Sequence, residues 1–364
     1  MTLSYRSRRR LQEVLWTMAF FIIGVNVYSM VRFWETEGYP LSELIGDAIT
    51  ATIGGAVGGI LLTVFHQSIL HQNARRRSFR FLVLTETLAD LLIIFLVFIP
   101  VTTLSGVLFA DMNWAESFRY NLDYMSSLPF LGLVLYLLVL SALFSFFRQV
   151  SRKFGPGVML GLLTGRYHNP REDDRIVMFL DLKSSTTHAE SLGHIRYSRL
   201  LQDCFYDLNG LLIPHEAQIY KYVGDEAIMS WKLGSGLREA NCLEIYFAYA
   251  ERLNQRRAYY EATYGLRPVF KAGINVGRIT VAEVGEERRE IEYHGDVLNT
   301  AARIQGQCNI YGKSLLISAP LQEMLGEITG YQIEPIGDIE LKGKASQVGI
   351  YSVEKIPVSL HEKS

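Results

Sequence analysis

Cysteine is scarce in this chain, and its spacing excludes two common uses of the residue. The 364 residues include only three cysteines, Cys204, Cys242 and Cys308. They lie too far apart in the sequence to match a structural zinc site or a disulfide framework. We therefore expect reduced thiols in a cytosolic part of the chain.

The chain also lacks an excess of positive charge. Its formal net charge is −1 at pH 7, and its second half contains no basic patch interleaved with aromatic residues. The sequence therefore predicts no nucleic-acid partner. Internal repeats and low-complexity segments are missing as well.

Long apolar runs, in contrast, fill the first 150 residues. Four of them, at 14–33, 46–70, 87–109 and 128–147, are long enough to cross a bilayer. The first has no small-residue cleavage site and is followed by further spans, so a cleaved signal peptide is not expected. We predict an all-α, four-helix membrane domain over residues 1–150.

The distribution of basic residues predicts how this domain is oriented. Basic side chains lie before the first span, between the second and third, and after the fourth: Arg6, Arg8, Arg9, Arg10, Arg75, Arg76, Arg77, Arg80, Arg148, Arg152 and Lys153. The links at 34–43 and 110–127 together carry six acidic residues and only one basic residue, Arg119. The positive-inside rule then places both termini and the following domain in the cytoplasm, at the cell (inner) membrane.

Two features inside these spans each have two interpretations. The segment Gly54-Gly-Ala-Val-Gly-Gly59 holds two overlapping G-x-x-x-G patterns, which permit close helix packing within one chain or between two chains. Glu86 and Asp90 either extend to the cytoplasmic interface or form a buried sensing site, because carboxylates inside a membrane are costly.

The rest of the chain has the pattern of a soluble α+β domain. Residues 151–174 form a connector, broken by Gly155, Pro156 and Gly157, that is either a passive tether or a signal-transmitting joint. Strands are expected at 175–182, 217–231 (a hairpin), 268–276, 278–284, 314–318, 331–335 and 348–353, and helices at 190–212, 236–262 and 297–308. This βαββαβ order predicts a ferredoxin-like fold over about 175–354. The whole catalytic domain is expected at 175–357, and a short tail follows it at 358–364.

Two aspartates follow apolar, strand-like runs in this domain. Asp181 ends the run that begins at Arg175, and Asp225 lies in a tight turn between two further runs. If these strands are neighbours, the two carboxylates converge at one sheet edge, where two carboxylates beside phosphates can hold a pair of divalent ions. Taken singly, Asp181 is better explained as a helix cap and Asp225 as ordinary turn chemistry.

A helix after Gly295 carries a second polar pair. Asn299 and Arg303 are four residues apart and therefore project from one helical face. The small residues between them, at 300–302, allow the helix to pack closely against a sheet or a partner. Arg303 suits a phosphate whose negative charge grows in a transition state, although an arginine near a helix C-terminus is also favoured by the helix dipole alone.

Four motifs in this order resemble the class III nucleotidyl cyclase catalytic domain. They are FLDLKSS from Phe179, KYVGDEA from Lys221, Gly273-Ile-Asn-Val-Gly277, and EYHGDVLNTAAR from Glu292. The resemblance covers about 175–354 and implies conversion of a nucleoside triphosphate to a 3′,5′-cyclic nucleotide and pyrophosphate.

The resemblance implies a role for each matching position. Asp181 and Asp225 would bind two Mg²⁺ (or Mn²⁺) ions per active site, which activate the ribose 3′-hydroxyl and hold the triphosphate. Asn299 would orient the ribose, and Arg303 would neutralise the α-phosphoryl group. The phosphate-binding positions would be the backbone at Leu182, Ser184 and Ser185 together with Lys342.

The choice of base depends on Lys221 and Glu292. In the family, the position of Lys221 is typically Lys in enzymes that use ATP and Glu in those that use GTP. The position of Glu292 is usually Asp or Thr in adenylate cyclases. Lys221 can donate to adenine N1, and Glu292 can accept from the exocyclic amine. Guanine reverses this pattern, and a mismatched buried polar group costs roughly 1–3 kcal/mol. We therefore predict ATP as substrate and a membrane-bound adenylate cyclase, with Glu292 one methylene longer than the usual Asp.

Since the family forms its site between two catalytic domains, the resemblance implies a homodimer through this domain, and the membrane helices are a further candidate contact. The membrane domain would then be a regulator.

Two functions other than adenylate cyclase are also considered: a guanylate cyclase, and a membrane sensor whose cyclase-like module is inactive. A diguanylate cyclase is disfavoured because Val223-Gly-Asp-Glu-Ala227 replaces the GG(D/E)EF loop of those enzymes.

Overall fold

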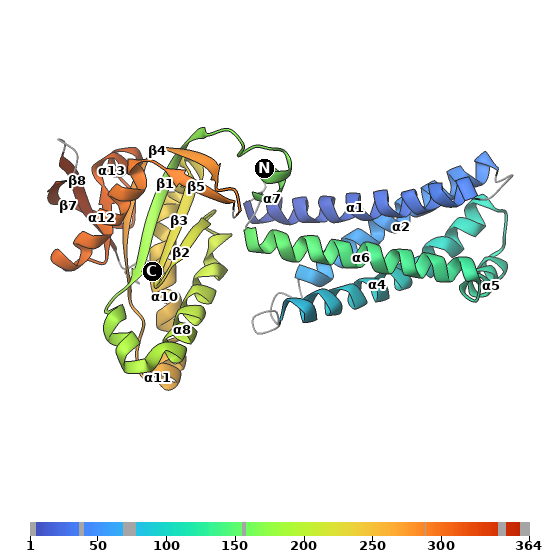
Figure 1. Ribbon diagram of the computed structural model, residues 1–364, viewed down its shortest axis with the longest axis horizontal. Helices are drawn as coiled ribbons and strands as arrows, with labels where there is room; N and C mark the ends of the chain where they lie inside the picture. The colour runs from blue at the N-terminus through green and yellow to red at the C-terminus, as the bar shows by residue number, and fades with distance from the viewer. Residues whose placement is uncertain are drawn as a thin grey trace, which may run out of the picture. The chain divides into compact units, whose positions relative to one another are not determined.

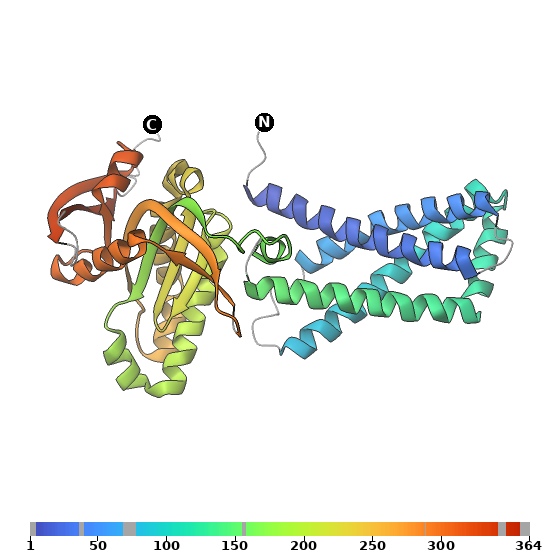
Figure 2. The ribbon, with the colours of Figure 1, turned by 45° about the horizontal axis from the view of Figure 1, so that its top comes forward.

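The computed structural model describes residues 5–35, 40–67, 78–154, 158–287, 289–340 and 347–356. The chain divides into two compact units, Met1–Phe154 and Gly155–Ser364. The first consists of long helices, and the second is a sheet flanked by helices (Figures 1 and 2).

The described part of the N-terminal unit is entirely helical. Its helices are α1 (Tyr5–Glu35), α2 (Leu41–Phe65), α4 (Phe79–Phe109), α5 (Trp114–Met125) and α6 (Leu128–Phe154). All but α5 are long and apolar enough to cross a membrane, which agrees with the four predicted spans. Helix α5 was not predicted, and it begins with a capping box in which the Asn113 side chain accepts from the Glu116 amide at 2.9 Å and Glu116 accepts from the Asn113 amide at 3.1 Å.

The G-x-x-x-G segment of α2 faces α1 of the same chain. A Cβ added at Gly55 would lie 2.8 Å from the Ile22 backbone, and one added at Gly59 would lie 2.7 Å from the Met18 backbone. Only glycine therefore permits the observed approach of the two helices. Gly58 belongs to the second G-x-x-x-G pattern, Gly54 to Gly58, and a Cβ added there would have no atom within 4 Å.

Glu86 and Asp90 on α4 are fully buried and paired with neighbouring helices. Asp90 Oδ1 lies 2.6 Å from Nε2 of His66, which follows α2. Glu86 Oε2 lies 2.5 Å from a guanidinium nitrogen of Arg148 on α6, and Glu86 Oε1 accepts from Gln149 at 2.7 Å. Arg148 also contacts His66 Nδ1 at 2.7 Å. The structure therefore contradicts the interpretation in which the two carboxylates extend to the membrane interface.

The C-terminal unit is built around one mixed sheet. Its described elements are α7 (Val158–Leu163), β1 (Arg171–Leu182), α8 (Ser185–Leu212), β2 (Gln218–Val223), β3 (Glu226–Lys232), α9 (Leu233–Leu237), η3 (Arg238–Ala240), α10 (Asn241–Gln255), α11 (Arg257–Tyr264), β4 (Phe270–Val284), β5 (Glu290–His294), α12 (Asp296–Ile310), β6 (Leu315–Ser318), α13 (Ala319–Leu325), β7 (Tyr331–Glu340) and β8 (Gln347–Lys355). The strand order is β2-β3-β1-β4-β6-β8-β7, with β5 paired to β4. The core order β2-β3-β1-β4, with β1 antiparallel to both of its neighbours, is the predicted ferredoxin-like arrangement.

The central strand β1 is buried on both faces because helices cover both sides of the sheet. Ile176, Met178 and Leu180 pack with residues of α8 and α10 in the main core. The alternate residues Val177 and Phe179 pack with residues of α12 on the other face. The apolar run that leads to Asp181 is thus explained by burial on both faces.

The predicted elements differ from the observed ones in several places. Strand β1 begins at Arg171, inside the predicted connector. One continuous strand, β4, replaces the two predicted at 268–276 and 278–284, since the extended backbone passes through Gly277. The short strand β5 and the helix α13 were missed. The predicted helix 236–262 is interrupted near Glu239 and at Arg256, giving four separate helical segments.

Candidate functional site

The β2–β3 hairpin places Asp225 next to Asp181. Val223 pairs with Glu226 across the hairpin, so Gly224 and Asp225 form its two-residue turn, and Gly224 has the positive φ of 61° that this turn requires. Glu226 in turn pairs with Asp181 across β3 and β1. The predicted convergence of the two aspartates at one sheet edge is therefore observed.

The acidic groups at this edge disfavour one another's ionisation. Burial raises the pKa of Asp181, and the Asp225 carboxyl raises it further through its charge and a hydrogen bond. Burial, followed by the charges of Asp181 and Asp225, raises the pKa of Glu226 to about 7. Burial and the neighbouring carboxyl groups thus both disfavour the ionised forms of Asp181 and Glu226.

Two further residues that were not predicted contact Asp181. Lys271, on β4, places its ammonium nitrogen 3.3 Å from Asp181 Oδ2. Gln305, on α12, donates to the same oxygen at 3.0 Å. Lys271 is directly opposite Asp181 in the β1–β4 ladder, a relation that strand pairing reveals and spacing in the sequence does not.

The paired carboxylates suit hard divalent cations that keep other ligands. Among the described residues, no group of three or more His, Cys, Asp or Glu side chains is placed to hold a metal ion. Mg²⁺ usually binds through one or two carboxylates together with substrate phosphates and water, rather than in an all-protein cage. Asp181 and Asp225, whose mutual repulsion a cation would relieve, fit that pattern.

Lys221 and Glu292 form an ion pair between strands that are not neighbours in the sheet. The Lys221 ammonium group bonds to Glu292 Oε1 and lies 3.3 Å from Glu290 Oε2. Both side chains of the pair are partly exposed, at 34% for Lys221 and 26% for Glu292. The two positions assigned to base choice therefore lie together in one chain and remain accessible to a ligand.

Tyr220, which no sequence motif indicated, completes this cluster. Its hydroxyl donates to Glu292 Oε2, and its ring stacks on that of Tyr293 at 4.1 Å with an interplanar angle of 8°. The register of the β2–β3 ladder shifts between Ile219 and Lys221. No periodic pattern in the sequence indicates such a bulge.

Helix α12 packs closely on β4, as its small residues predicted. A Cβ at Gly273 would lie 2.2 Å from the amide nitrogen of Gln305, so glycine is required where the helix crosses the strand. Arg303 precedes Gln305 by two residues, or about 200° around a helix. Arg303 therefore projects from the side of α12 opposite to Gln305, the residue that contacts Asp181. Asn299, six residues before Gln305, lies about 120° from it around the helix and is exposed.

The predicted phosphate-binding positions have different surroundings. Leu182 is buried, and the Lys183 amide donates to the Val269 carbonyl at 2.8 Å. Ser184 has a positive φ of 57° and makes no side-chain cap bond, and Ser185 is the first residue of α8. Lys342 lies outside the described residues.

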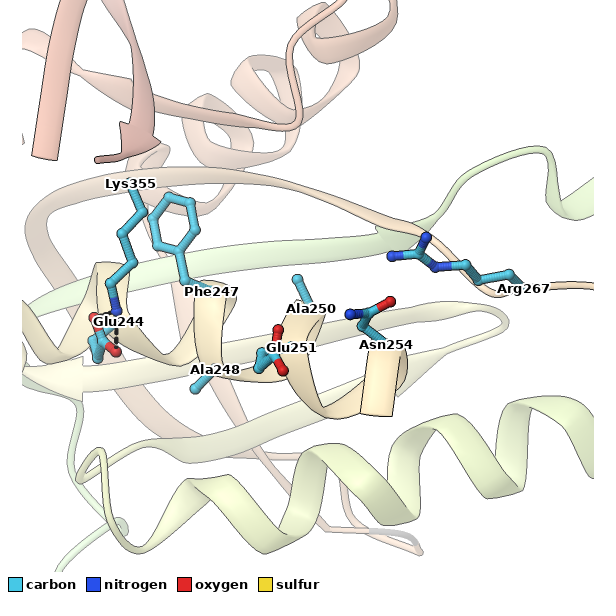
Figure 3. A pocket seen from close by; sticks show the side chains of 8 residues that line it. All are labelled: Glu244, Phe247, Ala248, Ala250, Glu251, Asn254, Arg267 and Lys355. Atoms are coloured by element: carbon cyan, nitrogen blue, oxygen red, sulfur yellow. Dashed lines mark hydrogen bonds and ion pairs between the residues drawn. The ribbon is translucent and has the colours of Figure 1, made fainter. Parts of the chain in front are cut away.

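A surface pocket lies elsewhere on the C-terminal unit, along α10 (Figure 3). Phe247, Ala248 and Glu251 line it together with Arg267 and the ion pair between Glu244 and Lys355. Its lining includes none of the residues predicted for nucleotide or metal binding. A pocket within one chain is not where this site is expected, since the resemblance implies a site between two domains.

Comparison with known proteins identifies the family of the C-terminal unit. Residues 168–355 match the family described as the adenylate and guanylate cyclase catalytic domain. The chain belongs to this family. It is 32% identical over 226 residues to adenylate cyclase 2 of Rhizobium meliloti (62% of each chain), and 26% identical over 181 residues to adenylate cyclase 1 of the same organism (48% of this chain, 27% of that one). The chain thus spans less than two thirds of the length of either relative.

Solved structures of this family share the fold. A bacterial light-regulated adenylyl cyclase superposes with a TM-score of 0.51 at 17% identity, covering 59% of this chain and 62% of that one. A second structure of a bacterial light-regulated adenylyl cyclase gives a TM-score of 0.53 at 17% identity, covering 64% and 66%. The predicted α+β fold of the cyclase domain is confirmed.

Proposed function

We propose that this chain is a membrane-bound adenylate cyclase that converts ATP to 3′,5′-cyclic AMP and pyrophosphate. The observation that carries the proposal is the presence, in one chain, of the Asp181–Asp225 carboxylate pair and the Lys221–Glu292 ion pair. The relatives named adenylate cyclase support the same reaction.

The reaction uses the carboxylate pair to hold divalent cations. Asp181 and Asp225 would hold two Mg²⁺ or Mn²⁺ ions. When bound, these would lower the pKa of the ribose 3′-hydroxyl and neutralise charge on the triphosphate. Asn299 orients the ribose for in-line attack on the α-phosphorus. Arg303 stabilises the negative charge that grows on the α-phosphoryl oxygens, and the start of α8 at Ser184 and Ser185 receives phosphate oxygens.

Adenine is selected by the ion pair on β2 and β5. Lys221 donates to adenine N1, and Glu292 accepts from the exocyclic amine. For guanine, Glu292 would face the C6 carbonyl and Lys221 would face a protonated N1. Two mismatched polar contacts disfavour GTP by roughly 1–3 kcal/mol each.

The site is completed by a second copy of the chain. On α12, Asn299 and Arg303 project away from the face that contacts their own Asp181. In a homodimer, Asp181 and Asp225 of one chain meet Lys221, Glu292, Asn299 and Arg303 of the other, which gives two equivalent sites related by symmetry.

The helical unit anchors the cyclase in the membrane and regulates it, with both termini in the cytoplasm. Buried charges in a membrane are costly and are usually functional. The network of His66, Asp90, Glu86, Arg148 and Gln149 ties α6 to the preceding helices close to the point where α6 ends at Phe154 and the chain enters the cyclase unit. A change in this network would therefore shift the helix that leads into the catalytic unit.

Nucleotide turnover by the full chain, purified in detergent, tests the proposal. ATP and GTP are assayed in parallel with Mg²⁺ or Mn²⁺, and an Asp225→Ala chain serves as the control. We expect cyclic AMP from ATP, with at least tenfold less product from GTP, and loss of both products in the control. Cyclic GMP as the main product would identify a guanylate cyclase, and no product from a dimeric wild-type chain would indicate an inactive sensor module.

A further inference from the structure

Tyr220 and Lys221 are consecutive on β2, yet both contact the same carboxylate. Successive residues of a regular strand point to opposite faces of the sheet. The register shift between Ile219 and Lys221 makes Tyr220 the extra residue of a β-bulge, and such bulges redirect side chains near functional sites. As a result the Tyr220 hydroxyl bonds to Glu292 Oε2 while Lys221 bonds to Glu292 Oε1.

Contacts with β5 fix the position and direction of the Tyr220 hydroxyl. The amide of Tyr293 donates to Tyr220 Oη at 3.1 Å, and the two rings stack in parallel. Because Oη accepts from this amide, its single proton is directed to Glu292. Burial, followed by the hydrogen bond to Glu292, raises the pKa of Tyr220 to about 12, so the hydroxyl stays protonated at neutral pH.

We propose that Tyr220 is a positioning residue that strengthens the selectivity for ATP over GTP by holding the Glu292 carboxylate in its acceptor orientation. This inference rests on the proposed function, in which Glu292 accepts from the adenine amine. A Glu side chain has one more rotatable bond than the Asp usual at this position, and without a second donor it can turn away from the base. Held by Tyr220, each carboxylate oxygen keeps a lone pair for the amine and repels the carbonyl oxygen of guanine.

Substitution of Tyr220 by Phe in the full chain tests this role, because Phe keeps the stacked ring and removes only the hydroxyl. A hydrogen bond to a charged group contributes about 1.5–3 kcal/mol, and we expect the preference for ATP to fall by about tenfold or more. Tyr222→Phe is the matched control: Tyr222 lies on the same strand, and its hydroxyl bonds to Asn209 at 3.2 Å. Its removal is expected to leave the preference unchanged.

The preference is measured as the ratio of dissociation constants for 3′-deoxy-ATP and 3′-deoxy-GTP with Mg²⁺, since these nucleotides lack the attacking hydroxyl. An equal ratio in Tyr220→Phe and the wild type, or an equal fall in both Phe variants, would overturn the proposal. So would a wild-type chain that does not prefer the adenine nucleotide. Failure of the wild type to make cyclic AMP would overturn the proposed reaction alone, because the binding ratio is read without turnover.

Discussion

Gln305 on α12 donates a hydrogen bond of 3.0 Å to the Asp181 carboxylate on β1. Gln305 is 7% exposed, so this bond fixes which side of α12 faces the acidic sheet edge. Arg303 then projects from the opposite side of the helix, and Asn299 from a face about 120° away from Gln305. Within one chain these two side chains are therefore directed away from the acidic edge, as the proposed site shared between two copies requires.

The acidic edge should bind metal through Asp225. We expect Asp225→Asn to lower the rate of cyclic nucleotide formation by about 10³, because a metal ion contributes several kcal/mol to the transition state. Mn²⁺ should raise the thermal unfolding midpoint of the wild type but not of this variant. Glu261→Gln, which removes an exposed carboxylate paired with Arg257, should behave like the wild type. A midpoint that still rises with Mn²⁺ in Asp225→Asn would contradict the assignment.

In the helical unit, Arg148→Ala should destabilise the bundle strongly. Loss of the guanidinium group leaves Glu86 fully buried without its cation, and breaking a buried ion pair costs about 3–5 kcal/mol. Unfolding of the detergent-solubilised full chain measures this loss. The double variant Glu86→Gln/Arg148→Ala should regain part of the stability, since no uncompensated charge remains. Additive losses in the double variant would show that the two groups do not interact.

The two G-x-x-x-G patterns of α2 offer a comparison of matched positions. Gly55→Leu should separate α1 from α2 and cost about 1–3 kcal/mol or more, because its Cβ would overlap the Ile22 backbone. Gly58→Ala, where the added Cβ meets nothing within 4 Å, should be tolerated, whereas Gly55→Ala should already be destabilising. The free energy of unfolding of the detergent-solubilised full chain, measured for each variant, compares the two positions. A larger effect at Gly58 would instead indicate that this face of α2 contacts a second chain.

Much of the site could be predicted because its residues lie at the ends of strongly patterned elements. Asp181 and Asp225 follow apolar strands, and the hairpin turn at Gly224 is a local signal. The meeting of Lys221 with Glu292 followed from family resemblance alone, since the two residues are 71 positions apart in the sequence.

The missed residues depend on relations that a linear pattern does not contain. Tyr220 faces Glu292 only because a bulge shifts the β2 register. Lys271 and Gln305 reach Asp181 through strand pairing and helix packing. Strand β5 is an exception: Glu290-Ile-Glu-Tyr-His294 alternates between polar and apolar residues, a pattern typical of a half-buried strand, and was missed although the sequence contains it.

The measurement that tests the central claim most directly is complementation between two inactive chains. Asp225→Ala removes a carboxylate of the acidic edge and Arg303→Ala removes the arginine of α12, so neither homodimer should form cyclic AMP. When the two chains are co-expressed in equal amounts, half of the dimers contain one intact site, and we expect about a quarter of the wild-type activity. Mixed dimers that form but stay inactive would contradict a site shared between two copies of the chain.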